Sequence, residues 1–152
     1  MSIEEVIKSV QPMDIPTKTV INIMYTSRYM EEKAAAVLKE HDLTIQQYNV
    51  LRILRGQRGV PTNLSTIQER MVDKNSNTTR LVDKLITKGY VNRRVCEQNR
   101  RKVEIFITDE GSALLKMLDP ITLKGNEELI ANLNPEELET LNNLLDKLRN
   151  DE

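Results

Sequence analysis

The sequence predicts a mainly α-helical protein with one small β-hairpin, and three observations favour this fold class. Apolar residues recur at helical spacing through most of the 152 residues, and they alternate with polar residues over one short segment near residue 105. Five glycines and five prolines supply few turns, which disfavours a fold of many strands. Apolar residues make up 39% of the chain and charged residues 30%, so a core and a soluble surface are both expected.

The composition excludes several classes of protein and site. Cys96 is the one cysteine, so no internal disulfide can form. With His41 as the one histidine, the chain falls short of the four ligands of a structural zinc site, and no metal or cofactor is expected. No apolar run approaches the roughly 20 residues that span a bilayer, and residues 1–10 do not resemble a signal peptide. The sequence therefore predicts a cytoplasmic protein that does not contact membranes.

The first long helix is expected over residues 15–41, after a lead-in without sustained periodicity. Its apolar residues lie mostly three or four positions apart, as on one face of a helix. Pro16 fits the first turn, where no backbone N–H is needed. The next helix begins at Thr44, because the Thr44 hydroxyl can cap Gln47 while the Gln47 side chain returns the bond. Gly56 and Gly59 are expected to end this helix.

A short helix and a longer one follow. Ser65 and Gln68 repeat the capping pattern and predict the start of the short helix. Residues 73–77 are typical of a turn. The longer helix is predicted to end at Gly89, with one polar and basic face opposite a narrow apolar stripe. That stripe consists of Leu81, Val82, Leu85 and Ile86.

A hairpin and two more helices complete the expected elements. Strands are predicted over residues 90–95 and 102–108, with a polar tip at residues 97–101. One helix then begins at Asp109 and Glu110, where acidic residues favour the start of a helix. The last helix follows Asn134 and carries leucines at heptad-like intervals.

The charge of the chain is concentrated in its middle. The net charge is −1, but residues 62–107 contain ten basic and five acidic residues, so this segment carries +5 and the remainder −6. Residues 75–102 alone carry +6. A basic middle between acidic flanks is typical of a local phosphate-binding surface, although a solvated face of mixed charge gives the same counts.

The order of these elements predicts a winged helix-turn-helix over residues 43–108. The major groove of DNA admits one α-helix, which must pack on its own domain and present polar groups from its N-terminal half. Asn, Arg, Thr and Ser side chains can contact bases or phosphates there, and arginines of the hairpin can enter the minor groove. The candidate DNA-binding residues are Ser76, Asn77, Thr78, Thr79, Arg80, Lys84, Arg100 and Arg101. Arg93 and Arg94 are interpreted as phosphate contacts or salt-bridge partners.

At these residues the chain resembles the MarR family of winged-helix transcriptional regulators. The resemblance extends from about residue 16 to residue 148 and implies the recognition-helix contacts at residues 76–80 and a wing arginine at Arg101. In the family an Asp usually opens the wing motif and braces this arginine, whereas this chain has Asn99. The matching segments are LTIQQYNVLR (43–52), DKNSNTTRLVDKL (73–85), KGYV (88–91), NRR (99–101) and ITDEG (107–111).

The resemblance also implies a homodimer in which the first helix and the last two helices interlock. The apolar stripes of residues 15–41 and 109–150 also favour a dimer, because a single winged helix of this size cannot cover them. A pair would hold two recognition helices roughly 34–36 Å apart, which suits a pseudo-palindromic site. The alternative is an intramolecular three-helix core.

The family further implies an effector, either a small aromatic or phenolic compound or an oxidant that reacts with a cysteine in the first helix. Residues 15–41 contain no cysteine, and Cys96 is interpreted as structural or incidental rather than redox-active. No ligand site is assigned.

Three functional hypotheses result. The first is a homodimeric, ligand-responsive repressor that binds double-stranded DNA. The second is a winged-helix protein-interaction module without DNA binding, which the +6 segment disfavours. The third is an enzyme, which the sequence disfavours because it has no glycine-rich phosphate loop and no apparent nucleophile–base pair.

Overall fold

The computed structural model of the protein describes residues 1–150 and is mainly helical with one two-stranded antiparallel sheet, as the sequence predicts. Within this range, no helix combines the length and the apolar character that are needed to cross a membrane. The elements are α1 (Ile3–Val6), α2 (Ile15–Lys39), α3 (Ile45–Gly56), α4 (Leu64–Arg70), α5 (Thr78–Thr87), β1 (Val91–Cys96), β2 (Asn99–Ile107), α6 (Asp109–Ile130) and α7 (Pro135–Leu148).

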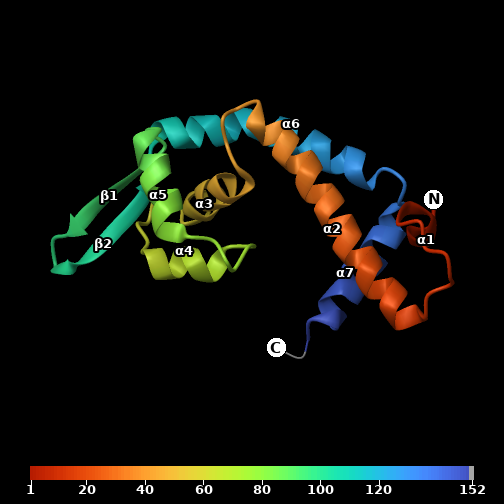
Figure 1. Ribbon diagram of the computed structural model, residues 1–152. Helices are drawn as coiled ribbons and strands as arrows, with labels where there is room; N and C mark the ends of the chain where they lie inside the picture. Colours follow the sequence, from red (N-terminus) through yellow and green to blue (C-terminus); the bar gives the residue numbers. More distant parts are fainter. Residues whose placement is uncertain (151–152) are drawn as a thin grey trace.

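The molecule is elongated and has two ends of different character (Figure 1). Helices α3, α4 and α5 and the β1–β2 hairpin form one end. Helix α7 and the N-terminal part of α2 lie together at the other end, with α1 beside them. Helices α2 and α6 run between the two ends. The DNA-binding elements expected from the sequence therefore lie at the opposite end from α7 and the N-terminal part of α2.

The helix starts follow local capping rules at most positions. Thr44 and Gln47 form the predicted capping box of α3, and Asn134 and Glu137 form a capping box at the start of α7. The prediction for α4 was wrong, because its N-cap is Asn63, whose side chain accepts from the backbone N–H of Thr66. Helix α4 therefore begins at Leu64 and already includes Ser65.

One core joins the helices and the hairpin. Its buried side chains come from α3, α4, α5, β1 and β2, and it extends to Leu38 of α2 and to Leu115 and Leu118 of α6. Burying such side chains stabilises the fold by about 1.5–3 kcal/mol each. Because this core includes parts of α2 and α6, the helix-turn-helix is packed directly on the two helices that lead away from it.

The hairpin has an irregular register at its free end. Val91 lies opposite Ile107 and Val95 opposite Val103, but the next pair joins Cys96 to Asn99. Residues 100–102 therefore form a bulge on β2 without Cα partners on β1. The predicted five-residue tip was wrong in its extent, since only residues 97 and 98 form the turn and Arg100 and Arg101 lie on β2. At the other end, Thr62 and Ile105 exchange two backbone hydrogen bonds, which attach the α3–α4 connection to β2.

Candidate nucleic-acid interface

Helix α5 is the candidate recognition helix, and its first residue is Thr78. The side chain of Asn77 caps it, because Asn77 Oδ1 accepts a hydrogen bond from the backbone N–H of Arg80 at 3.1 Å. Ser76 and Asn77 therefore precede the helix rather than lying in its N-terminal half, which corrects the expectation from sequence. Asn77 is exposed.

Thr78 is placed inside the fold. Its side chain is only 6% exposed, and its hydroxyl donates to Oε1 of Gln68 in α4. The Nε2 of Gln68 donates in turn to the backbone oxygen of Lys74 at 2.9 Å. The amide of Gln68 thus ties α4 to the turn and to the start of α5. Thr78 positions the helix, and its hydroxyl is not presented to solvent.

The turn between α4 and α5 is held by further side chains. Asn49 Oδ1 of α3 accepts from the backbone N–H of Val72, and Asp73 Oδ1 accepts from that of Asn75, both at 2.9 Å. The hydroxyl oxygen of the half-buried Ser76 has no hydrogen-bond partner among the described residues. Side chains of α3, α4 and α5 thus all contact this turn or its ends, through Asn49, Gln68 and Thr78. These contacts fix the direction of α5 relative to α3 and α4.

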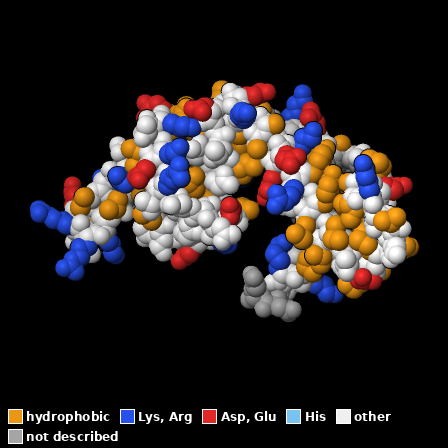
Figure 2. All heavy atoms as spheres, viewed as in Figure 1, with side chains coloured by type: hydrophobic (Ala, Val, Ile, Leu, Met, Phe, Trp, Pro, Cys, Tyr) orange, Lys and Arg blue, Asp and Glu red, His pale blue; other side chains and the backbone are white. Residues whose placement is uncertain are grey.

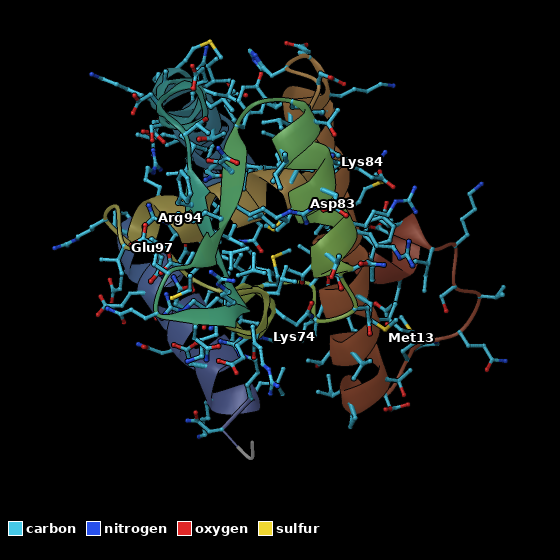
Figure 3. All side chains as sticks on the ribbon, turned by 90° about the vertical axis from the view of Figure 1, so that its left-hand side faces the viewer. Met13, Lys74, Asp83, Lys84, Arg94 and Glu97 are labelled. Atoms are coloured by element: carbon cyan, nitrogen blue, oxygen red, sulfur yellow. The ribbon has the colours of Figure 1, made fainter. Side chains whose placement is uncertain are left out.

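The outward face of α5 presents Thr79, Arg80 and Lys84, which are all exposed. Figure 3 shows Asp83 and Lys84 on α5 beside the hairpin, with Lys74 in the turn below them. Asp83 Oδ1 accepts from Nη1 of Arg93 in β1 at 2.8 Å. This ion pair attaches the first strand of the hairpin to the recognition helix. Lys84 forms no ion pair with a carboxylate among residues 1–150.

Arg93 and Arg94 are both occupied by ion pairs, which favours the second of the two roles considered for them. Arg94 Nε lies 2.6 Å from Glu104 Oε2 on the neighbouring strand, and its guanidinium lies 5.5 Å from the centre of the Phe106 ring. Its hydrogen bond with Glu104 raises the pKa of Arg94 above its ordinary value. Arg93 thus attaches the hairpin to α5, and Arg94 joins its two strands.

The bulge on β2 presents three consecutive cations, Arg100, Arg101 and Lys102, which are all exposed. Asn99 Oδ1 accepts from the backbone N–H of Arg101 at 3.1 Å. Asn99 therefore braces the backbone of the wing at the position where the family usually has Asp. Sequence reasoning did not select Lys102; the run of three adjacent basic residues was the available signal.

The cations of α5 and of the bulge share one property. Among residues 1–150, none of them forms an ion pair with a carboxylate. Figure 2 shows Lys and Arg side chains at the free end of the hairpin, at the far side of the molecule from the hydrophobic side chains over α2 and α7. This set, which we name the cationic face, consists of Arg80, Lys84, Arg100, Arg101 and Lys102.

Cys96 ends β1 as a half-buried free cysteine opposite Asn99. The described part of the chain contains no group of three or more His, Cys, Asp or Glu side chains that could hold a metal ion.

Comparisons with known proteins agree with this arrangement. The profile of the MarR family matches residues 43–103, the segment that holds α3 to most of β2. The chain is 27% identical over 139 residues to the HTH-type transcriptional regulator PecS of Dickeya dadantii, covering 90% of this chain and 83% of PecS.

Solved structures of regulators share the fold. A MarR transcription factor from Planctomyces limnophilus superposes with a TM-score of 0.69 at 29% identity, covering 90% of this chain and 98% of that one. BpsR of Bordetella bronchiseptica, whose DNA binding is regulated by 6-hydroxynicotinic acid, superposes with a TM-score of 0.79 at 20% identity, covering 91% and 97%. The chain therefore belongs to the MarR family and is a DNA-binding transcriptional regulator rather than an enzyme.

Proposed function

We propose that the protein is a homodimeric, sequence-specific repressor that binds a pseudo-palindromic site in double-stranded DNA and releases it when a small aromatic or phenolic ligand binds. The observation that carries this proposal is the cationic face, because its five side chains are exposed and have no carboxylate partner within residues 1–150. Unpaired cations beside a polar helix suit phosphates flanking a major groove.

Within this face we assign different contacts to the helix and the wing. Thr79 and Arg80 lie in the first turn of α5, so we place them on base edges, with Asn77 at the groove entrance. Lys84 lies one turn further along and is assigned to phosphate. Arg100 and Arg101 leave the hairpin at its bulge and are assigned to the adjacent minor groove or its phosphates. Thr78 supports the helix start from inside through its bond to Gln68, and no contact is assigned to Ser76.

The homodimer is supported by apolar surface that a single chain leaves uncovered. No residue of α7 is buried, and Leu141, Leu144 and Leu148 are all exposed along it. Val20 and Met24 of α2 are also exposed. An isolated helix of 14 residues is marginal in water, so α7 needs a partner for its apolar stripe. This favours a second copy over the intramolecular three-helix core.

The effector is proposed from the family resemblance and from BpsR, which responds to an aromatic acid. A ligand that binds one arrangement of the two recognition helices better than another shifts their spacing, and DNA affinity falls with it. Titrating 6-hydroxynicotinic acid and simple phenols into a preformed protein–DNA complex tests this part separately from DNA binding.

Selection of bound duplexes from a random pool tests the central proposal. We expect recovered sequences with two inverted half-sites about one helical turn apart. Unselective recovery from the pool, or no binding at low salt, would contradict the proposal.

Two variants then test the assignments. Arg80→Ala is expected to weaken binding to the selected site about 5- to 150-fold while changing binding to random duplex little, since one bidentate base contact contributes about 1–3 kcal/mol of discrimination. Arg101→Ala is expected to weaken both, because minor-groove and phosphate contacts read little sequence. An equal loss on both duplexes for Arg80→Ala would refute direct base readout.

A further inference from the structure

The C-terminal end of α5 is bonded to both chain segments that connect the helix-turn-helix to the long helices. On one side, the Lys88 Nζ donates to the backbone oxygen of Asp42 and lies 3.4 Å from the carboxylate Oδ2 of Asp42. Asp42 belongs to the connection between α2 and α3. The same ammonium donates to Oε1 of Gln47 at 3.2 Å.

On the other side, Thr108 joins the end of α5 to the start of α6. The Thr108 hydroxyl donates to the backbone oxygen of Gly89 at 2.7 Å. The Thr108 backbone N–H donates to the backbone oxygen of Tyr90 at 3.0 Å. Thr108 is also the N-cap of α6. Both covalent links between the two ends of the molecule are therefore bonded to residues 88–90, which directly follow the recognition helix.

Lys88 differs from the lysine one turn before it. Lys84 is exposed on the outward face, whereas the side chain of Lys88 is 24% exposed and points into the α2–α3 connection. Gln47, one of its acceptors, is almost fully buried, and the same oxygen accepts from the backbone N–H of Thr44 in the capping box of α3. An ammonium with three acceptors around it is not free to bind phosphate.

Lys88 also contacts a residue with an unusual backbone conformation, Asp42. Asp42 has φ of 54°, a left-handed conformation that residues other than glycine rarely adopt. Such a conformation persists where surrounding contacts fix it, and the bond from Lys88 to the Asp42 carbonyl is one of these contacts. Lys88 is also the C-cap residue of α5, the end of a helix at which the dipole favours a positive charge.

We propose that Lys88 is a positioning residue for DNA binding, which fixes the angle between the recognition helix and α2 and thereby the distance between half-sites that the dimer accepts. This inference rests on the proposed function. Helix α5 has ten residues and is about 15 Å long. Because α5 is fixed on α3 and α4 near its start, a small rotation of these three helices together relative to α2 displaces Arg80, which lies far from Lys88 along α5, relative to the groove.

A spacing series tests the proposal with a matched pair of variants. The duplexes carry the selected half-sites with zero to two base pairs inserted or removed between them. Lys88→Met is expected to reduce the preference for the best spacing by about fivefold or more, while the salt dependence of binding stays unchanged. Lys84→Met, the control on the same helix, is expected to lower the salt slope by about 0.9 per lost phosphate contact and to keep the spacing preference. Lys88→Arg keeps a cationic donor and is expected to restore the preference.

A measurement without DNA separates this inference from the proposed function. Spin labels on Glu32→Cys in α2 and Thr79→Cys in α5, both exposed positions, report the angle between these helices in a Cys96→Ser background. Dilution into unlabelled protein removes distances between copies. Lys88→Met is expected to broaden the distance distribution, and Lys84→Met is not.

Each outcome decides one question. A lower salt slope with unchanged spacing preference and unchanged label distances for Lys88→Met would make Lys88 a phosphate contact and overturn the inference. An unchanged binding profile for this variant would overturn it as well. A wild-type protein that binds no duplex would refute the proposed function, while the label distances would still decide whether Lys88 sets the helix angle.

Discussion

Gly111, in the first turn of α6, lies against the chain that leaves the recognition helix. A Cβ at this position would lie 2.3 Å from the backbone oxygen of Tyr90 and 2.7 Å from Cγ1 of Ile107. The Tyr90 oxygen already accepts from the Thr108 backbone N–H, so it cannot move away without breaking that bond. Glycine is required here by close packing, since its backbone conformation is an ordinary helical one.

Gly111→Ala is therefore expected to lower the melting temperature, by about 2–12 °C for an overpacking cost of about 1–3 kcal/mol. Gly125→Ala in the same helix is the control, because nothing lies within 4 Å of its Cβ position. There the substitution is expected to raise the melting temperature slightly, as alanine favours a helix by roughly 0.5–1 kcal/mol over glycine. Thermal unfolding followed by circular dichroism measures both, and equal shifts of the two variants would contradict the close-packing argument.

At the scale of elements, α3 and α6 are joined by an ion pair. Arg55 Nη1 contacts both carboxylate oxygens of Asp119, at 3.0 and 2.8 Å, and the Tyr48 hydroxyl donates to Oγ1 of Thr122 at 3.3 Å. The hydrogen bond from Arg55 lowers the pKa of Asp119 below its usual value, with the charges of Arg55 and Arg52 adding to the effect. A carboxyl whose pKa is lowered by folding stabilises the folded state above its unfolded pKa, about 3.9, and this stabilisation is lost as the pH falls through the folded pKa.

Asp119→Asn is accordingly expected to lower the melting temperature at pH 7 by a few degrees at most, because the pair is part-exposed and such pairs contribute about 0–1 kcal/mol. As the pH falls through the lowered pKa of Asp119 and the wild-type carboxyl becomes protonated, the difference is expected to shrink and then vanish. Glu128→Gln provides the control, since Glu128 contacts Lys124 at 4.0 Å on the solvent side of α6. A difference between wild type and Asp119→Asn that stayed constant from pH 7 to pH 2 would argue against the ion pair as its source.

Local sequence rules predicted those elements whose ends depend on nearby residues. The capping box at Thr44, the helix start after Asn134 and the stop at Gly89 each need only a few consecutive residues, and the structure confirms them. Helix α4 was predicted to start too late because Gln68 suggested a capping box. Its amide instead contacts Thr78 and Lys74, which are close in space only after α4 and α5 have packed.

The candidate site shows the same limit. Exposure of Arg80 and Lys84 follows from the apolar stripe of α5, so periodicity was sufficient to select them. The burial of Thr78 depends on Gln68, ten residues away. The position of Arg101 depends on the register of β2 against β1, which alternation of residue types does not specify. Contacts across elements decide these cases, and a linear pattern does not contain them.

For the whole molecule, the proposed pairing of two chains depends on apolar side chains at the end opposite the cationic face. Leu144 in α7 is 58% exposed and follows Leu141 on the same stripe. A charged side chain buried in an interface without a partner is strongly unfavourable. In a symmetric dimer one substitution places such a charge on both copies, so its free-energy cost arises twice.

Leu144→Glu is expected to shift sedimentation from dimer to monomer at micromolar concentration and to weaken DNA binding at least tenfold, because one recognition helix must then bind alone. Val103→Glu is the control, since Val103 is an exposed apolar residue on the hairpin. Its sedimentation is expected to remain that of the wild type. A monomeric wild-type protein would contradict the pairing directly.

The bulge of residues 100–102 also has a consequence for proteolysis. Trypsin cleaves after arginine and lysine in segments that can be drawn into its active site as a free extended strand, and the three adjacent cations of β2 lack Cα partners on β1. A brief digestion is expected to nick the native chain first at these residues. If the wing enters a groove, bound duplex will shield the peptide bonds after these three residues. The rate of cleavage in the bulge then reports the fraction of protein whose wing is bound to DNA.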